Sequence, residues 1–242
     1  MEHAKTVIER LFDKAVAYKK ELVLSAAVIA VSGAGIAGYF FYKTHVAKLA
    51  HKAYAQALVL ENARVLKEGD EHSATLNKTF LSADEKWQAV ADAFGAVYAD
   101  FNHVGIGVMA GAAQAQALIR LGKLDKARTV LADVLARITS PELRALYSLT
   151  YARLLMDSDV EVEQQKGVTL LSQLASTKDS AVHDSALYYL GLHYWLSDDT
   201  VSATNYWKQL VMQYDTPDKK SSPWVSKVKE KLALVESAAG SV

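Results

Sequence analysis

The feature that most constrains this chain is an uncharged run of 21 residues at 22–42, with the sequence LVLSAAVIAVSGAGIAGYFFY. Lys19, Lys20 and Glu21 precede the run, and Lys43 follows it. An α-helix rises about 1.5 Å per residue, so a helix of this length matches a hydrocarbon core roughly 30 Å thick. The run therefore predicts one transmembrane helix at residues 22–42.

Three other interpretations of the run were compared with a membrane span. A secretory signal peptide has an apolar core of about 7–15 residues and ends at small residues, whereas this run is longer and ends in four aromatics, Tyr39 to Tyr42. Such aromatics are typical of a membrane interface. A phosphate-binding glycine turn would follow a strand, and none precedes the glycines of the run. A buried helix of a soluble domain remains the main alternative.

The charges beside the run predict its orientation. Five basic residues lie within the twenty that precede it, and three lie within the same distance after it: Lys5, Arg10, Lys14, Lys19 and Lys20, against Lys43, Lys48 and Lys52. Cytoplasmic flanks carry the lysine and arginine excess. We therefore expect residues 1–21 to be a short cytoplasmic segment and the C-terminal domain to lie on the far side of the membrane. In a Gram-negative-type cell that side is the periplasm, and the chain would be a single-pass protein of the bacterial inner membrane.

Small residues recur at every fourth position of the run, namely Ala26, Ala30, Ala34 and Gly38. Small side chains at this spacing let a second helix approach closely in lipid. The stripe is therefore a candidate helix–helix contact, and a homodimer is one form that it could take. An alanine-rich span also produces such a stripe by chance, so this alternative stays open.

The rest of the chain has helical spacing of apolar residues and no strand-like alternation. The span is expected to continue as a stalk helix at 43–69, which Gly69 and Asp70 would end. Ser82 and Glu85 form a capping box for the next helix, because their side chains satisfy free N–H groups at its start. The fold class expected is therefore all-α.

Residues 82–213 contain three helix pairs in phase. Small residues occur where paired helices would approach most closely, with equivalent second-helix positions separated by 40 and 36 residues. They are Ala115, Ala152 and Gly191 in the first helices, and Ala127, Gly167 and Ala203 in the second. This is the pattern of a tetratricopeptide repeat. Gly167 and a turn about three residues longer, at 160–165, are expected to loosen the middle repeat.

The segment 214–242 is expected to be a polar linker followed by one amphipathic helix at 224–236. A solenoid needs a polar-faced element to cover its terminal apolar face. The C-terminal helix is therefore interpreted as a cap.

In tetratricopeptide solenoids the first helices line a concave surface, so the repeat phase predicts a peptide-binding groove. The principal positions are Gln116, Ile119, Arg120, Leu149, Arg153, Tyr188, Leu192 and Trp195, accompanied by Met109, Ala112 and Leu146. An apolar groove with two arginines suits an amphipathic or extended peptide that bears a carboxylate. For Tyr188 and Trp195 the preferred interpretation is that they are core residues beneath the C-terminal helix, which leaves Arg120 and Arg153 as the better contact candidates.

Composition and motifs exclude several functions. Basic and acidic residues both number 27, so no net field attracts nucleic acid. The seven histidines have no HExxH spacing, and cysteine is absent. No nucleophile or phosphate-loop motif is found. The acidic stretch 157–163 is interpreted as a cation site or, at least as well, as a solvated loop. We expect no enzyme activity, metal, cofactor or nucleic-acid partner.

The layout resembles a known family. One span, a stalk and helix pairs that carry LGKLDKA at 121–127 and LTYAR at 149–153 resemble the YfgM-type ancillary subunit of the bacterial Sec translocon, over residues 22–213. The helix from Pro223 onward is not part of that pattern. The resemblance implies a scaffold that contacts translocon subunits and periplasmic chaperones. An adaptor for outer-membrane biogenesis or cell-wall machinery would share all these features, whereas a hydrolase would need a polar constellation that the groove lacks.

Overall fold

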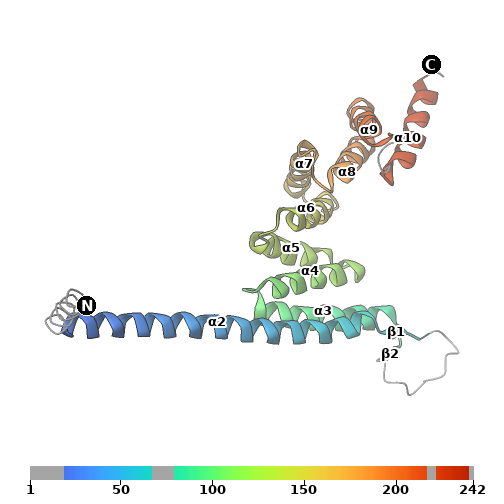
Figure 1. The fold of residues 1–242 in the computed structure, drawn as a ribbon. Coiled ribbons are helices and arrows are strands. Elements are labelled where there is room, and N and C mark those ends of the chain that lie inside the picture. The colour runs from blue at the N-terminus through green and yellow to red at the C-terminus, as the bar shows by residue number, and fades with distance from the viewer. Residues whose placement is uncertain (1–18, 67–78, 217–221, 240–242) are drawn as a thin grey trace, which may run out of the picture. The chain divides into compact units, whose positions relative to one another are not determined.

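The computed structural model describes residues 19–66, 79–216 and 222–239 (Figure 1). The predicted cytoplasmic segment lies almost entirely outside the described residues, as do Gly69 and Asp70. The chain forms two compact units, Met1–Lys52 and Ala53–Val242. Helix α2 (Lys19–Glu61) runs through the boundary between them without a break.

In the first unit, every side chain from residue 29 to residue 45 is exposed. The exposed set contains large apolar groups, namely Ile29, Val31, Ile36, Tyr39, Phe40, Phe41 and Tyr42. Among the residues that the structure describes, no helix is both long enough and apolar enough to span a bilayer. The side chains of residue 22 and residues 24–28, which belong to the predicted span, lie outside the description. The span at 22–42 therefore stays a prediction.

The stalk helix is shorter than the sequence predicted, because α2 ends at Glu61 rather than at residue 69. The Asn62 side chain donates to the Leu58 carbonyl at 3.0 Å and so caps the last turn. Beyond it, β1 (Arg64–Val65) pairs in parallel with β2 (Thr79–Phe80). The expectation that this part of the chain contains helix and no strand was wrong. Two strands of two residues each, paired across residues 67–78, produce no alternation that can be recognised in the sequence.

The last part of α2, from Ala53 to Glu61, is part of the repeat core instead of a free stalk. Its Ala57 is 2% exposed, and the Tyr54 ring lies 5.2 Å from that of Phe94 on α3 (Ala83–Phe101). Helix α3 begins at the predicted capping box: Ser82 Oγ accepts from the Glu85 N–H at 3.1 Å, and the Glu85 carboxylate accepts from the Leu81 N–H at 3.0 Å.

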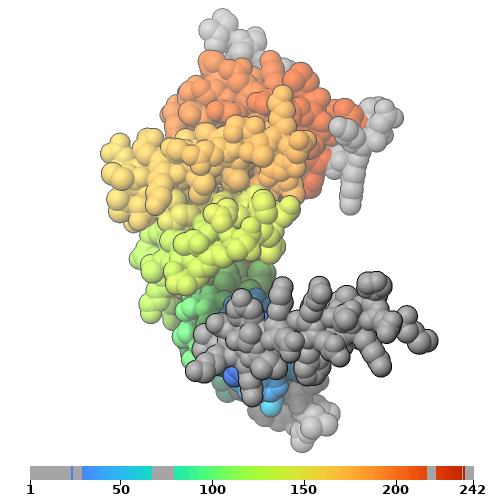
Figure 2. All heavy atoms as spheres, turned by 60° about the vertical axis from the view of Figure 1, so that its left-hand side comes forward, coloured from blue at the N-terminus to red at the C-terminus, as the bar shows by residue number. Residues whose placement is uncertain are grey.

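Three antiparallel helix pairs follow, and Figures 1 and 2 show them as successive layers. Helix α4 (Gly105–Arg120) pairs with α5 (Leu124–Arg137), α6 (Pro141–Met156) with α7 (Glu161–Ser176), and α8 (His183–Leu196) with α9 (Thr200–Tyr214). Each first helix also contacts the second helix of the preceding pair. The predicted solenoid is therefore present.

The paired helices meet at the predicted small residues. Ala115, Ala127, Ala152 and Ala203 have no exposed surface. A Cβ atom at Gly191 would overlap the Trp207 ring, and one at Gly167 would lie 2.7 Å from the Ala152 carbonyl oxygen. At Gly167 itself the expected loosening is absent, because α6 and α7 approach too closely there for even a methyl group. The extra residues of this pair lie mostly in α7, which begins six residues before Gly167.

The turn inside the first pair depends on a glycine conformation. Gly122 has a φ of +69°, and the Lys123 N–H returns to the Leu118 carbonyl at 2.9 Å. This is a Schellman ending, for which the left-handed region is required. Asp198, with a φ of 60°, holds the equivalent place in the third pair, where the Asp199 N–H donates to the Tyr194 carbonyl at 2.9 Å.

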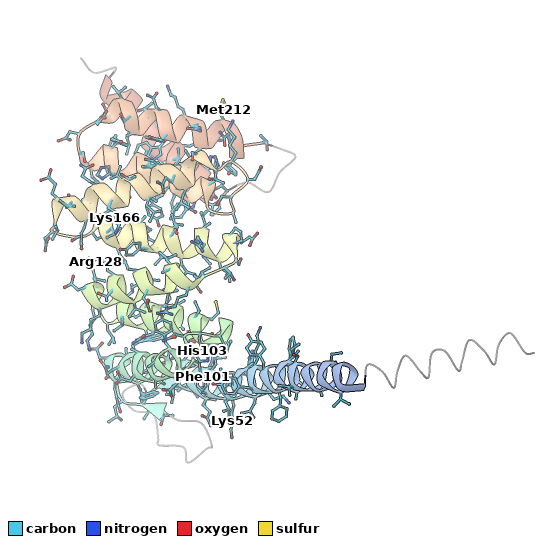
Figure 3. All side chains as sticks on the ribbon, turned by 90° about the vertical axis from the view of Figure 1, so that its left-hand side faces the viewer. Lys52, Phe101, His103, Arg128, Lys166 and Met212 are labelled. Atoms are coloured by element: carbon cyan, nitrogen blue, oxygen red, sulfur yellow. The ribbon has the colours of Figure 1, made fainter. Side chains whose placement is uncertain are left out.

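Arg128 joins the first pair to the second. Its Nη1 donates to the Leu154 carbonyl at 3.2 Å, and its Nε lies 3.4 Å from a Glu163 carboxylate oxygen. Figure 3 shows Arg128 and Lys166 on the same edge of the stack. The arginine thereby satisfies a carbonyl near the C-terminal end of α6, a group that the helix itself leaves free.

The C-terminal helix α10 (Trp224–Ala239) packs against α8 and α9. Val228 is fully buried and follows Gly191 by 37 residues, the same interval that separates Ala115 from Ala152. Helix α10 therefore stands where the first helix of a fourth pair would stand. Lys227, Lys229 and Glu230 are exposed on it, as a capping helix requires.

We expect Gly167→Ala to destabilise the repeat domain by about 1–3 kcal/mol, because the neighbouring atom is a backbone carbonyl that cannot turn away. Thermal unfolding followed by circular dichroism measures the change. Gly105→Ala is the matched control, since a Cβ atom there meets nothing within 4 Å. Equal melting temperatures for the two variants would contradict the close approach.

Candidate functional site

The predicted groove residues differ widely in exposure. Gln116, Arg120 and Arg153 are exposed, whereas Ile119, Leu192 and Trp195 are half-buried, and Leu149 and Tyr188 are buried. Of the accompanying positions, Leu146 is exposed, Met109 half-buried and Ala112 buried. The surface accessible to a partner thus consists mainly of two arginines, one glutamine and aliphatic edges, on the first helices α4, α6 and α8.

Both arginines of this surface lie over aromatic rings from neighbouring helices. The Arg120 guanidinium carbon is 4.3 Å from the ring centroid of Trp87, and that of Arg153 is 4.4 Å from the ring of Tyr189. Cation–π attraction holds the planar groups in place. Neither arginine forms an ion pair within the described part of the chain. The predicted groove residues therefore include two positioned cations that pair with no carboxylate among the described residues.

The sequence did not reveal Trp87 and Tyr189 as partners of these arginines. Trp87 precedes Arg120 by 33 residues, and Tyr189 follows Arg153 by 36. These separations are close to one repeat length. A search for aromatic residues one repeat away from each groove arginine would have found both.

Tyr188 lies in the core, which is the interpretation that the sequence favoured. The Trp224 ring of α10 stacks on it with centroids 4.1 Å apart and an interplanar angle of 20°. Trp224 Nε1 also donates to Ser185 Oγ at 2.9 Å. Trp195 is only half-buried: its ring lies 5.6 Å from that of Trp207, and Lys231 approaches it from α10. Helix α10 therefore covers Tyr188 and approaches Trp195, two of the predicted groove positions.

A polar network fastens the start of α10 to the third pair. Asp184 accepts from the Ser222 hydroxyl at 2.6 Å and from the Ser185 N–H at 2.6 Å. At the other side of α10, Lys229 pairs with Asp215 at 2.6 Å. Together with the burial of Val225 and Val228, these contacts hold the capping helix against α8 and α9.

Next to Asp184, the side chain of His183 is completely buried. Its Nδ1 is 2.7 Å from the Tyr214 hydroxyl at the end of α9. Burial is the main cause that lowers the pKa of His183, and Lys178 acts in the same direction, whereas the Ala175 carbonyl and Asp184 oppose them. Burial also lowers the pKa of His193. Both imidazoles are therefore neutral at pH 7.

The predicted helix–helix stripe lies in the first unit. Ala30, Ala34 and Gly38 are exposed, and a Cβ atom at Gly38 would meet nothing within 4 Å. The side chain of Ala26 lies outside the description. The stripe is thus accessible over the part that can be examined.

The acidic stretch 157–163 is explained by local structure. Asp157 caps the C-terminus of α6, and Glu161 and Glu163 lie in the first turn of α7, where a helix dipole favours negative charge. Glu163 also pairs with Arg128. Within the described ranges, no cluster of three acidic, histidine or cysteine side chains has the geometry to hold a metal ion.

The fold and its surface define a class of protein: a tetratricopeptide-like helical solenoid. The chain is similar to two crystal structures of nearly identical TPR-like repeats of a kinesin light chain from Podosopora anserina. One of the two is a variant with a single substitution. The TM-scores are 0.52 for the variant and 0.51 for the other structure, with 17% and 16% sequence identity. Each match covers 65% of this chain and 81% of the other.

No family model matches the sequence, and no protein with a curated description matches it. The structural likeness shows the fold alone, and it agrees with the predicted tetratricopeptide type. Repeat folds of this kind are typically non-catalytic scaffolds for protein–protein interaction. Membership of the YfgM-type family is not shown by these comparisons.

We expect the free energy of unfolding to fall as the pH drops below about 6.5, the usual pKa of an unfolded histidine. Below that pH the histidines of the unfolded chain bind protons, whereas the buried histidines of the folded chain bind them only at lower pH. Acid therefore favours the unfolded state. Urea unfolding at pH 7.5 and pH 5.5 measures the effect. His183→Gln should reduce the difference and His103→Gln, at an exposed position, should not. An unchanged pH dependence in His183→Gln would contradict this role.

Proposed function

We propose that this chain is a membrane-anchored scaffold of the bacterial envelope that holds a peptide-binding solenoid beside the Sec translocon and links it to periplasmic chaperones. The observation that carries the binding role is that two of the predicted groove residues, Arg120 and Arg153, form no ion pair among the described residues and are each held over an aromatic ring. A positioned guanidinium binds a carboxylate with two parallel hydrogen bonds. The partner segment is therefore an acidic, amphipathic or extended peptide.

The membrane anchor is the second part of the proposal. Its support is the uncharged run at 22–42 and the exposure of large apolar side chains along α2, including Ile29, Ile36, Phe40 and Phe41. Leaving such surface in water is unfavourable by about 25 cal/mol per Å². Lipid around this part of α2 would remove the cost. The small-residue stripe at Ala30, Ala34 and Gly38 would then be available to a second copy or to a partner helix.

The translocon and chaperones are proposed as partners from the resemblance over residues 22–213. An adaptor for another envelope assembly, in outer-membrane biogenesis or cell-wall synthesis, is the second candidate function. Both share the anchor, the groove and the absence of a catalytic motif in the sequence. They differ only in the proteins that occupy the groove, so partner identification separates them.

We expect a photo-crosslinking amino acid at Gln116 or Leu146 to capture protein partners in intact membranes, because both positions are exposed on the first helices. The same amino acid at Thr129, exposed on the second helix α5, is the control. Mass spectrometry identifies the adducts. Translocon subunits and periplasmic chaperones support the first function; other envelope proteins support the second, and adducts at Thr129 alone would contradict the groove.

In the same assay, Arg120→Gln or Arg153→Gln should lower the yield of adducts. Loss of one charged hydrogen bond costs about 1.5–3 kcal/mol, which is roughly a tenfold change in affinity or more. Arg137→Gln is the matched control, because Arg137 is paired with Asp133 at 3.1 Å on α5. If all three variants behave alike, the groove arginines do not bind the partner.

Topology is tested by a reporter fused after Val242. Alkaline phosphatase, which is active only after export, should be active there, and a cytoplasmic fluorescent reporter should be dark if exported unfolded through the translocon. Reversing the flanking charge, with Lys19 and Lys20 replaced by Glu, should lower the exported fraction. Reporter activity confined to the cytoplasm in the unaltered chain would overturn the periplasmic placement.

A further inference from the structure

The middle helix pair has an open pocket of about 550 Å³ that lies between the first half of α6 and the second half of α7. Its lining comprises Thr139, Pro141, Arg144, Ala145, Ser148, Leu170, Gln173, Leu174, Thr177 and Ser180. None of these residues belongs to the predicted groove. The pocket therefore requires an explanation of its own.

The neighbouring repeats show what fills this place elsewhere in the chain. The position four residues before the small first-helix residue is Gly111, Ser148 and Leu187 in the three pairs. Leu187 is fully buried and fills its own repeat. At Gly111 the space is taken by Tyr98 of the preceding helix, whose ring carbon would lie 2.7 Å from an added Cβ atom.

In the middle pair, neither solution is available. Ser148 is too small to fill the space. The preceding helix carries Val134 at the position equivalent to Tyr98, and valine is smaller than tyrosine. The two positions are equivalent because each follows a buried alanine, Ala91 or Ala127, by seven residues. As a result, Leu174 remains half-buried, although its counterparts Val134 and Leu210 have no exposed surface. The pocket is thus a packing position that lacks its large side chain.

The charge around the pocket restricts what could enter it. Arg144 is the charged residue of the lining, and it is exposed. One of its nitrogens donates to the Ile138 carbonyl, and no carboxylate pairs with it among the described residues. The nearby Glu142 accepts a hydrogen bond from the Ser140 hydroxyl at 2.6 Å and is not in the lining.

We propose that this pocket is a second docking site, which takes an aromatic side chain of a partner protein that has a carboxylate beside it. The ring would pack on Ala145, Leu170 and Leu174, where the other repeats place a Leu or a Tyr. The carboxylate would pair with the free N–H groups of Arg144. A buried aromatic anchor with a neighbouring ion pair is the usual composition of an interface hot spot.

The test uses the full chain and fluorine NMR of a synthetic peptide, acetyl-Ser-Gly-(4-fluoro-Phe)-Asp-Gly-Ser-amide. The fluorine signal should broaden with added protein. Ser148→Leu, which copies Leu187 of the next repeat, should weaken binding at least tenfold while its melting temperature stays equal to or above that of the unaltered chain. Ser148→Val serves the same purpose if the leucine variant does not fold. Thr169→Leu, at an exposed position of α7, should bind the peptide normally.

A second experiment tests whether binding requires the carboxylate of the peptide. A peptide with Lys in place of Asp should bind several-fold more weakly, and Arg144→Gln should abolish the difference between the two peptides. Equal binding of both peptides to the unaltered chain would overturn the proposal, as would undiminished binding to both Ser148 variants. Broadening of free 3-(4-fluorophenyl)propionate without broadening of either peptide would assign the pocket to a small aromatic acid instead. A dimer in sedimentation that Ser148→Leu dissociates would assign it to a second copy of this chain.

Discussion

The close approach of paired helices at small residues is the constraint on which the rest of this structure depends. Ala115, Ala127, Ala152 and Ala203 are fully buried, an added Cβ atom at Gly167 would lie 2.7 Å from the Ala152 carbonyl oxygen, and one at Gly191 would overlap the Trp207 ring. Because these contacts recur at nearly constant intervals, the pairs stack in register and place their first helices on one surface. Where an interval changes, as before Gly167, the extra residues extend a helix and leave the contact in place.

That register determines where large side chains have to go, and so it also shapes the functional surfaces. Trp207 packs its ring against Gly191, and Tyr98 fills the space left by Gly111. Ser148 has no such partner, so a pocket opens beside it. Two other aromatic residues contact arginines instead of filling a space between helices. The Arg120 guanidinium lies over the ring of Trp87, and that of Arg153 lies over the ring of Tyr189. The cation–aromatic contacts and the side pocket thus follow from the same packing rule.

The C-terminal helix shows how such a stack ends. With α10 in the place of a fourth first helix, the apolar edge of α8 and α9 is covered, and Trp224 stacks on Tyr188. The network around Asp184 and the buried His183 joins this cap to the ends of α8 and α9. The cap and the groove are therefore linked, and a change that loosens α10 also exposes Tyr188.

The sequence by itself determined the helical class, the capping box at Ser82, the small-residue contacts and the three pairs, because each depends on residues within a turn or at one repeat spacing. It also predicted Arg120 and Arg153 as exposed candidates for partner contact, and both are exposed in the structure. Only the tertiary structure decided that α2 ends at Glu61, that β1 pairs with β2, that Tyr188 lies under α10 and that Ser148 faces an open pocket. These features depend on contacts between residues that no local pattern relates, and on whether a neighbouring side chain is large enough to fill the space between two helices.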